Sequence, residues 1–212
     1  AVTIGEFVQL QPGQLVLDVG SGCGHLGAWY FEWFGARTLG LDFLQNGVEF
    51  AKQHVTPVAP TQFCWMDVAS QLGSWLPDRS VHLATAISVL HYMRSDVERW
   101  EAGSEPYPNS GPRNVTRTPC HKLFAASRTQ CRVAWEMFRA TKVGGHTWVA
   151  HNGAYKGKWD PKRAWGQRYW RCCFYKELMR KEIQIREVPE NDIFLTGLTW
   201  DETYSLILKR LA

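Results

Sequence analysis

A short apolar run that ends in an acid and leads into three alternating glycines constrains the fold of this chain more than any other feature. Residues 14–19 (Gln-Leu-Val-Leu-Asp-Val) follow the turn signal Pro12-Gly13 and predict a buried strand. Residues 20–24 (Gly-Ser-Gly-Cys-Gly) predict a turn, because glycine adopts backbone angles that are closed to other residues. Such a turn lets the backbone lie close against a ligand. The segment therefore predicts a ligand-binding strand–turn–helix unit.

Strand and helix patterns alternate along the rest of the chain. Short apolar runs predict buried strands, and apolar residues spaced by three or four predict helices. This alternation favours an α/β fold with a largely parallel sheet. The predicted strands are 38–41, 61–66, 80–89, 146–150, 183–188 and 204–209, and the predicted helices are 25–34, 46–55, 122–141 and 169–181.

Several of these helices carry signals for their ends and for their buried faces. We expect Asn46 to cap the helix that starts there, and Gly144-Gly145 to stop the long helix before the fifth strand. The expected core-facing residues are Leu26, Trp29, Tyr30 and Trp33 in the first helix, and Cys131, Ala134, Trp135 and Phe138 in the long one.

The glycine pattern separates this turn from two common nucleotide-binding motifs. The dinucleotide fingerprint is G-x-G-x-x-G, whereas the glycines at 20, 22 and 24 alternate and an acid, Asp18, precedes them by two residues. No G-x-x-x-x-G-K-[ST] sequence is present, which excludes a P-loop. Two further acids, Asp42 and Asp67, end the second and third predicted strands.

Together these features resemble the class I S-adenosylmethionine-dependent methyltransferases. Residues 18–24 resemble the first motif of that family, and residues 76–78 and 87–91 resemble the loop and fourth strand of its methyltransferase type 11 group. Residues 139–145 resemble the turn before the fifth strand, so the resemblance covers roughly residues 12–153. It implies a Rossmann-like three-layer sandwich whose mostly parallel seven-stranded sheet has an antiparallel last strand.

The resemblance also implies a cofactor and a set of residues that bind it. The cofactor is S-adenosylmethionine, with S-adenosylhomocysteine as the product, and no metal is expected. In the family, the acid at Asp42 grips the ribose hydroxyls and the acid at Asp67 meets the adenine amino group. The expected cofactor-binding residues are Asp18, Gly20, Ser21, Gly22, Cys23, Gly24, Asp42, Phe43, Asp67, Val68, Ile87 and Ser88.

Candidate catalytic residues follow the fourth and fifth strands, because ligands of open α/β sheets bind beyond the carboxyl ends of the strands. His91 and Tyr92 follow the fourth strand, and His151 follows the fifth. Histidine accepts a proton near neutral pH, so His91 and then His151 are the candidate general bases, with Tyr92 orienting the acceptor. An acceptor that is already a free amine or an anion would need no base. His82 is a departure, because many relatives carry Asp there in the fourth strand.

The sequence leaves three hypotheses open for the function. We expect transfer to an oxygen or nitrogen of a small or medium-sized molecule. Methylation of a protein or glycan is the second reading, and a non-catalytic cofactor-binding scaffold is the third. Nucleic acid is not expected as a partner, because residues 88–91 read Ser-Val-Leu-His instead of the Asn/Asp-Pro-Pro-Tyr tetrad of many RNA-methylating enzymes.

Length and composition bound the rest. The 212 residues fit a single methyltransferase domain, 1–212, with an irregular insertion at about 101–118. No apolar run approaches the roughly 20 residues that span a bilayer. The six cysteines form no C-x-x-C pair, which favours reduced thiols and a cytoplasmic protein. The sequon Asn114-Val115-Thr116 favours the alternative, a secretory compartment reached through an upstream signal since removed. The sequence does not indicate an oligomeric state.

Overall fold

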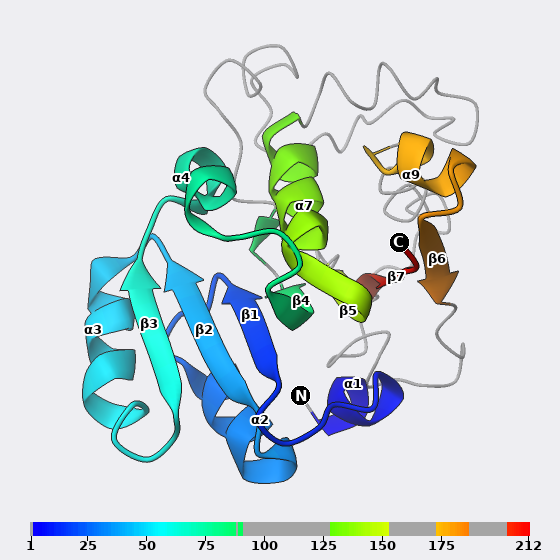
Figure 1. Ribbon diagram of the computed structural model, residues 1–212. Helices are drawn as coiled ribbons and strands as arrows, with labels where there is room; N and C mark the ends of the chain where they lie inside the picture. The colour runs from blue at the N-terminus through cyan, green and yellow to red at the C-terminus, as the bar shows by residue number, and fades with distance from the viewer. Residues whose placement is uncertain (1, 88, 91–127, 153–172, 187–202) are drawn as a thin grey trace.

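A seven-stranded sheet forms the middle layer of the computed structural model, which describes residues 2–87, 89–90, 128–152, 173–186 and 203–212. The strand order is β3-β2-β1-β4-β5-β7-β6, and β7 runs antiparallel to its neighbours β5 and β6. The predicted Rossmann-like fold is thus confirmed (Figure 1). The strands are β1 (Leu15–Val19), β2 (Arg37–Asp42), β3 (Thr61–Trp65), β4 (Val81–Ile87), β5 (Thr141–Asn152), β6 (Ile183–Arg186) and β7 (Thr203–Arg210).

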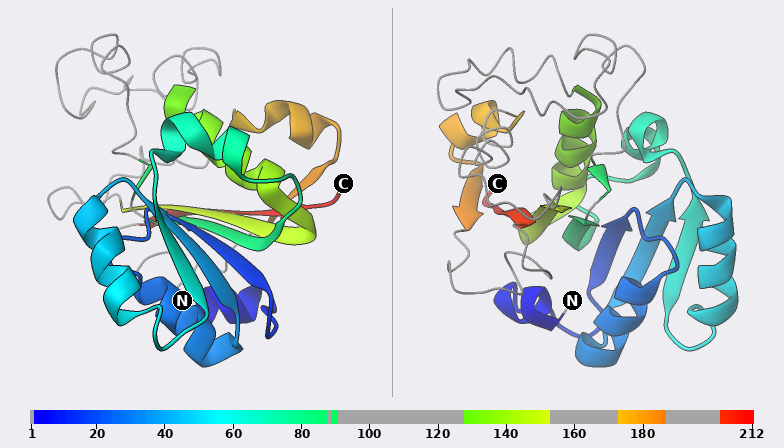
Figure 2. Two further views of the ribbon diagram at one scale, coloured as in Figure 1. Left: turned by 60° about the vertical axis from the view of Figure 1, so that its left-hand side comes forward. Right: turned by 180° about the vertical axis from the view of Figure 1, so that it is seen from behind.

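Helices cover both faces of the sheet, as the edge-on view in Figure 2 shows. One face carries α1 (Val2–Phe7), α2 (His25–Phe34) and α3 (Gln45–His54). The other face carries α4 (Val68–Trp75), α7 (Arg128–Ala140) and α9 (Tyr175–Met179). None of the helices that the structure describes is long and apolar enough to cross a membrane.

The alternation of β1 divides its side chains between two cores, because successive residues of a strand point to opposite faces. Leu17 and Val19 belong to the larger core, which packs the sheet against α4 and α7. Val16 belongs to the smaller core together with Tyr30 of α2 and Leu83 of β4. Asp18 lies between Leu17 and Val19 in sequence and therefore faces the α2 side, where the glycine-rich turn enters the helix.

Two predicted helix boundaries are wrong, and side-chain hydrogen bonds at the helix ends explain both. Helix α3 begins at Gln45 without an Asn46 cap, and its N-cap residue Leu44 instead donates its N–H to Asp42 Oδ1 at 2.8 Å. Helix α7 ends at Ala140, before the two glycines. The guanidinium of Arg210 donates to the carbonyl groups of Phe138, Arg139 and Thr141 at 2.8–3.2 Å, which satisfies the end of α7 without a glycine turn.

The two glycines serve β5 instead of ending the helix. Gly144 has φ +81°, and the register of β5 against β4 shifts between the Val81 and Leu83 pairs. A Cβ on Gly145 would lie 2.6 Å from the His82 carbonyl oxygen, so glycine is needed for the close approach of the two strands.

Three tryptophans that were expected in the core are exposed instead. Trp29 and Trp33 are 46% and 60% exposed, because α2 packs on the sheet through Gly27 and Tyr30 and turns its tryptophans outward. Trp135 of α7 is 39% exposed, and its Nε1 donates to Glu177 of α9 at 3.0 Å. The other expected stripe residues of α7, Cys131, Ala134 and Phe138, are buried.

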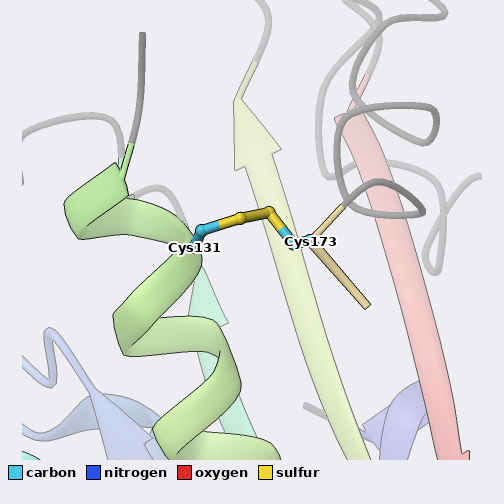
Figure 3. Close-up of a disulfide and its surroundings, with 2 residues drawn as sticks. All are labelled: Cys131 and Cys173. Carbon is cyan, nitrogen blue, oxygen red and sulfur yellow. A yellow bond between two sulfur atoms is a disulfide. The ribbon is translucent and has the colours of Figure 1, made fainter. Parts of the chain in front are cut away.

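The expectation of reduced cysteines is wrong for one pair. Cys131 of α7 and Cys173, just before α9, form a disulfide with a Cα–Cα distance of 5.5 Å (Figure 3). Cys131 is buried in the larger core, and Cys173 packs against it. Within the described residues, Cys23 and Cys64 are free. The bond covalently ties the segment that leads into α9 to the long helix on the same face.

Candidate cofactor site

The carboxyl ends of β1, β2 and β3 meet at one edge of the sheet, since the three strands are parallel neighbours. Asp18 lies within β1, Asp42 is the last residue of β2, and Asp67 follows β3 by two residues. The fold therefore gathers the three acids that the sequence singled out along the same strand ends.

The glycine-rich turn is hydrogen-bonded to the end of β2. The N–H groups of Gly20 and Ser21 donate to the Leu41 carbonyl oxygen at 2.7 and 3.1 Å. The Gly22 N–H then donates to Asp42 Oδ2 at 2.8 Å. These hydrogen bonds within the protein itself hold the turn in a fixed position at the strand ends.

The glycines of the turn differ in what surrounds them. Gly20 and Gly24 have φ +77° and +83°, and a Cβ at either position would collide with the side chain of Val89 or Phe63. Gly22 has φ +52°, but a Cβ there would meet nothing within 4 Å. Gly20 and Gly24 are thus required by the packing of the protein itself, whereas Gly22 borders open space.

Asp42 anchors the turn and the start of α3 at once. Its side chain accepts the N–H of Gly22 on Oδ2 and the N–H of Leu44 on Oδ1, both at 2.8 Å, and the residue is only 7% exposed. Each carboxylate oxygen retains a further lone pair, so the group can still accept hydroxyl hydrogens. This fits the ribose contact that the resemblance implies.

Asp67 caps a helix that the sequence reading did not anticipate. Its Oδ1 accepts the Ala69 N–H at 3.0 Å, and its Oδ2 accepts the Ser70 hydroxyl at 2.8 Å. Asp67 is exposed, and Val68 is buried as the first residue of α4. An acid at a strand end is also a helix start signal, and that signal could have revealed α4.

A small exposed apolar surface borders the Asp42 end of the sheet. Phe43, Leu44 and Trp65 are 60%, 57% and 62% exposed, and Trp65 Nε1 donates to the Phe43 carbonyl oxygen at 2.8 Å. Phe43 was expected at the cofactor, but Trp65 was not. Its position at the last residue of β3, next to the expected acid, is the signal that could have identified it.

Three buried polar atoms around the turn and Asp18 lack hydrogen-bond partners among the described residues: Asp18 Oδ2, Ser21 Oγ and the Tyr30 hydroxyl, whose pKa is raised by burial and by Asp18. Burial raises the pKa of Asp18 to about 6, opposed by a hydrogen bond from Thr85 and reinforced by the negative charge of Asp42. A buried acceptor without a donor favours a ligand that brings one. The acceptor oxygens of Asp18 and Asp42 and the open space at Gly22 therefore fit a nucleoside cofactor that carries a cationic amino group.

The remaining expected residues are placed only in part. Cys23 is a half-buried free thiol in the turn, and Ile87 at the end of β4 packs into the smaller core. Ser88, His91 and Tyr92 lie outside the described residues. His151 lies on β5 opposite Tyr204 of β7, one residue beyond the Ile87–Ala150 pair and hence at the same edge of the sheet as the turn.

His82 stands where many relatives carry Asp, and its contacts explain why a histidine suits this position. Its Nδ1 accepts the N–H of Leu15 at the start of β1 (3.1 Å), and its Nε2 lies 3.2 Å from Lys142 Nζ. Burial and the Lys142 charge lower the pKa of His82, which keeps the imidazole neutral and able to accept. His82 thus secures the amino end of β1, opposite the candidate site.

No cluster of three or more His, Cys, Asp or Glu side chains that could hold a metal ion is found in the ranges that the structure describes.

Residues 16–103 match the family described as "Methyltransferase domain". No curated protein shows significant sequence similarity to the chain. Among solved structures, a methyltransferase from Aquifex aeolicus, dependent on S-adenosylmethionine, is 14% identical over 97% of this chain and 87% of its own, with a TM-score of 0.58. A TehB-like enzyme of the same dependence from Corynebacterium glutamicum is 13% identical over 97% and 84%, with a TM-score of 0.57.

A third similar structure comes from a complex of the Haloferax volcanii Trm112 methyltransferase activator with a methyltransferase. It is 16% identical over 99% of this chain and 89% of its own, with a TM-score of 0.55. At these identities the structures bear on the fold alone. Their similarity supports the Rossmann-like fold described above.

Proposed function

We propose that this chain is a class I S-adenosylmethionine-dependent methyltransferase and that it transfers the methyl group to an oxygen or nitrogen of a small or medium-sized molecule. The match of residues 16–103 to a methyltransferase domain and the shared fold support the proposal. The observation that carries the proposal is the Gly22–Asp42 hydrogen bond beside the unpartnered Asp18 Oδ2. At one edge of the sheet, the hydrogen bond holds the turn in place, Asp42 can accept hydroxyl groups, and Asp18 can pair with a cationic group.

We assign the cofactor contacts residue by residue. The backbone of residues 20–24 borders the amino acid part, Asp42 accepts the ribose hydroxyls, and the exposed Phe43 and Trp65 supply apolar contact for the adenine ring. Asp67 contributes a spare lone pair besides its capping bonds, and Val68, Ile87 and Ser88 complete the expected set.

When bound, S-adenosylmethionine supplies a methyl group made electrophilic by its sulfonium. The chain's own task is to align an acceptor with that methyl and to remove its proton where it has one. His151 is a candidate for the second role because β5 brings it to the same edge of the sheet. His91 and Tyr92 remain sequence-based candidates for the base and for orienting the acceptor.

We further propose an oxidising compartment as the place of action. The support is the Cys131–Cys173 disulfide, because stable disulfides are rare in the reducing cytosol. The sequon Asn114-Val115-Thr116 is in keeping with a secretory route. An endoglycosidase that shifts the mass of the native protein would support this, whereas an unmodified chain with six free thiols would refute it.

The test of the acceptor class is a labelled-methyl transfer assay on cell extract separated into small molecules, proteins and glycans. Label in the small-molecule fraction is expected. Label in protein or glycan would establish the second reading. Calorimetry with S-adenosylhomocysteine runs in parallel, because binding without transfer to any fraction would indicate a scaffold.

The carboxylate of Asp67 can be tested apart from its capping role. Asn also caps helices, so Asp67→Asn should leave the melting temperature unchanged. A loss of S-adenosylhomocysteine affinity in this variant is expected if the carboxylate meets the adenine amino group, and unchanged affinity would limit Asp67 to capping α4.

A further inference from the structure

Beneath the glycine-rich turn, two polar side chains face each other from neighbouring strands. Asp18 of β1 and Thr85 of β4 are register partners in a parallel pair, and the Thr85 hydroxyl donates to Asp18 Oδ1 at 2.9 Å. The same hydroxyl lies 3.3 Å from the Leu17 carbonyl oxygen. The two residues are 1% and 0% exposed, so the pair is removed from bulk water.

The surroundings of Asp18 disfavour its ionised form. Oδ2 has no partner in the part of the chain that the structure describes. The titratable groups that act on or near the carboxyl are Asp42 of β2, which is also acidic, and Tyr30 of α2, whose own pKa is raised by burial and by Asp18. A buried carboxylate without a cation is costly, which raises the pKa of Asp18 to about 6 and favours the protonated acid below that pH.

We propose that Thr85 is a positioning residue that fixes one oxygen of Asp18 and leaves the other for the amino group of the cofactor, and that cofactor binding releases a proton from Asp18. The inference rests on the proposed function, because it needs Asp18 to lie beside the amino acid part of the cofactor. The O–H bond of the Asp18 acid breaks and its proton passes to the solvent buffer. An ion pair between the carboxylate and an ammonium group takes the place of that bond.

Proton release makes cofactor affinity depend on pH in one direction. Below pH 6 the proton must be removed before the ion pair can form, so affinity falls as the pH falls. With the pKa of Asp18 raised to about 6, affinity at pH 5 should be about ten-fold weaker than at pH 7. Close to one proton should be released at pH 5, and almost none at pH 8.

The experiment is calorimetry of S-adenosylhomocysteine binding to the full chain at pH 5, 6 and 8, in buffers of different ionisation enthalpy. The dependence of the heat on the buffer counts the protons released. A matched ligand, 5′-methylthioadenosine, lacks the amino acid part and should release none. Binding of S-adenosylhomocysteine at pH 5 without proton release would overturn the inference. If neither nucleoside binds, the proposed function fails instead.

Variants separate positioning by Thr85 from a merely structural role. Thr85→Val removes the donor that lowers the pKa of Asp18, so the midpoint of the pH–affinity profile should move upward, and Thr85→Ser should restore it. Thr38→Val is the control, because the Thr38 hydroxyl of β2 is buried and has no hydrogen-bond partner among the described residues. An unchanged midpoint in Thr85→Val, with Asp18→Asn still abolishing the pH dependence, would exclude the role of Thr85.

A readout without ligand guards against misfolding of the valine variant. The carboxyl carbon of Asp18 can be titrated by NMR in the ligand-free protein, where Thr85→Val and Thr85→Ser should differ in the midpoint as they do in affinity. Equal midpoints in folded wild-type and Thr85→Val protein would overturn the inference independently of binding.

Discussion

The Gly22 N–H donates a 2.8 Å hydrogen bond to Asp42 Oδ2, which joins the glycine-rich turn to the end of the neighbouring strand. Because the other oxygen of Asp42 receives the Leu44 N–H, one carboxylate fixes both the turn and the start of α3. Asp42 thus stabilises the turn in the free protein and is a candidate to contact the cofactor in the bound protein.

Asp42→Ala should therefore lower both stability and cofactor affinity. Hydrogen bonds to a charged acceptor contribute about 1.5–3 kcal/mol each, so the free energy of unfolding should fall by about 3 kcal/mol or more. The affinity for S-adenosylhomocysteine should fall at least about ten-fold, since the ribose acceptor and the turn are lost together. Denaturant titration and calorimetry measure the two effects. Destabilisation with unchanged affinity would confine Asp42 to the fold.

Gly22→Ala and Gly13→Ala form a matched pair. Both glycines have positive φ, +52° and +75°, and neither has anything within 4 Å of an added Cβ. Alanine in this conformation costs roughly 1–2 kcal/mol at either position. Only Gly22 borders the proposed ligand, so only Gly22→Ala should also lose S-adenosylhomocysteine affinity. Equal affinities in the two variants would separate Gly22 from the cofactor.

Buried His146 should make folding sensitive to acid. It is 6% exposed and its Nε2 lacks a partner among the described residues. Burial, with the charges of Arg186 and Lys209, lowers its pKa from 6.5 to about 4. The unfolded chain therefore binds this proton first, so the contribution is complete above pH 6.5 and is lost as the pH falls toward 4.

His146→Leu isolates that contribution to stability. A variant is needed because, between pH 4 and pH 7, Asp18 changes the stability in the opposite direction to His146. The stability of the variant relative to wild type should rise by about 3 kcal/mol between pH 7 and pH 4. Urea midpoints over this range measure the difference. A difference that does not depend on pH would show that His146 does not titrate on unfolding.

Asp18→Asn should stabilise the free protein while it weakens cofactor binding. With its pKa raised from 3.8 to about 6, Asp18 costs folding about 2–3 kcal/mol at pH 7 and little at pH 4. The amide oxygen can still accept from Thr85, so the gain should appear at neutral pH and vanish in acid. Melting curves at pH 7 and pH 4 check it, and destabilisation at pH 7 would contradict the assignment of a buried, unpaired charge.

Most strands of the sheet can be predicted from the sequence, because each strand is marked by its own short run of apolar residues. Short apolar runs predicted β1 to β4, β6 and β7 to within a few residues, and the alternating glycines predicted the turn before α2. The site could be expected for the same reason, since strand ends and the acids that follow them are fixed by local pattern. Their hydrogen-bond partners, such as Gly22 for Asp42, followed only from the fold.

Errors arose where a distant residue decides a local feature. The end of α7 depends on Arg210, some seventy residues away, which contacts its last carbonyl groups, so the glycines at 144 and 145 are not the stop signal that the sequence predicts. The outward Trp29 depends on how closely Gly27 lets α2 approach Thr38. Periodicity within a single helix contains none of this information.

The disulfide between Cys131 and Cys173 should be a major source of stability. It closes a sequence separation of 42 residues, for which the loss of chain entropy in the unfolded state predicts about 4 kcal/mol. Dithiothreitol should therefore lower the denaturant midpoint of wild type, but not that of Cys173→Ala. Alkylation of the denatured protein without reductant should leave both cysteines unlabelled, as mass spectrometry of peptides would reveal. Labelling of both residues would mean that the bond is absent from the native protein and would remove the main support for an oxidising compartment.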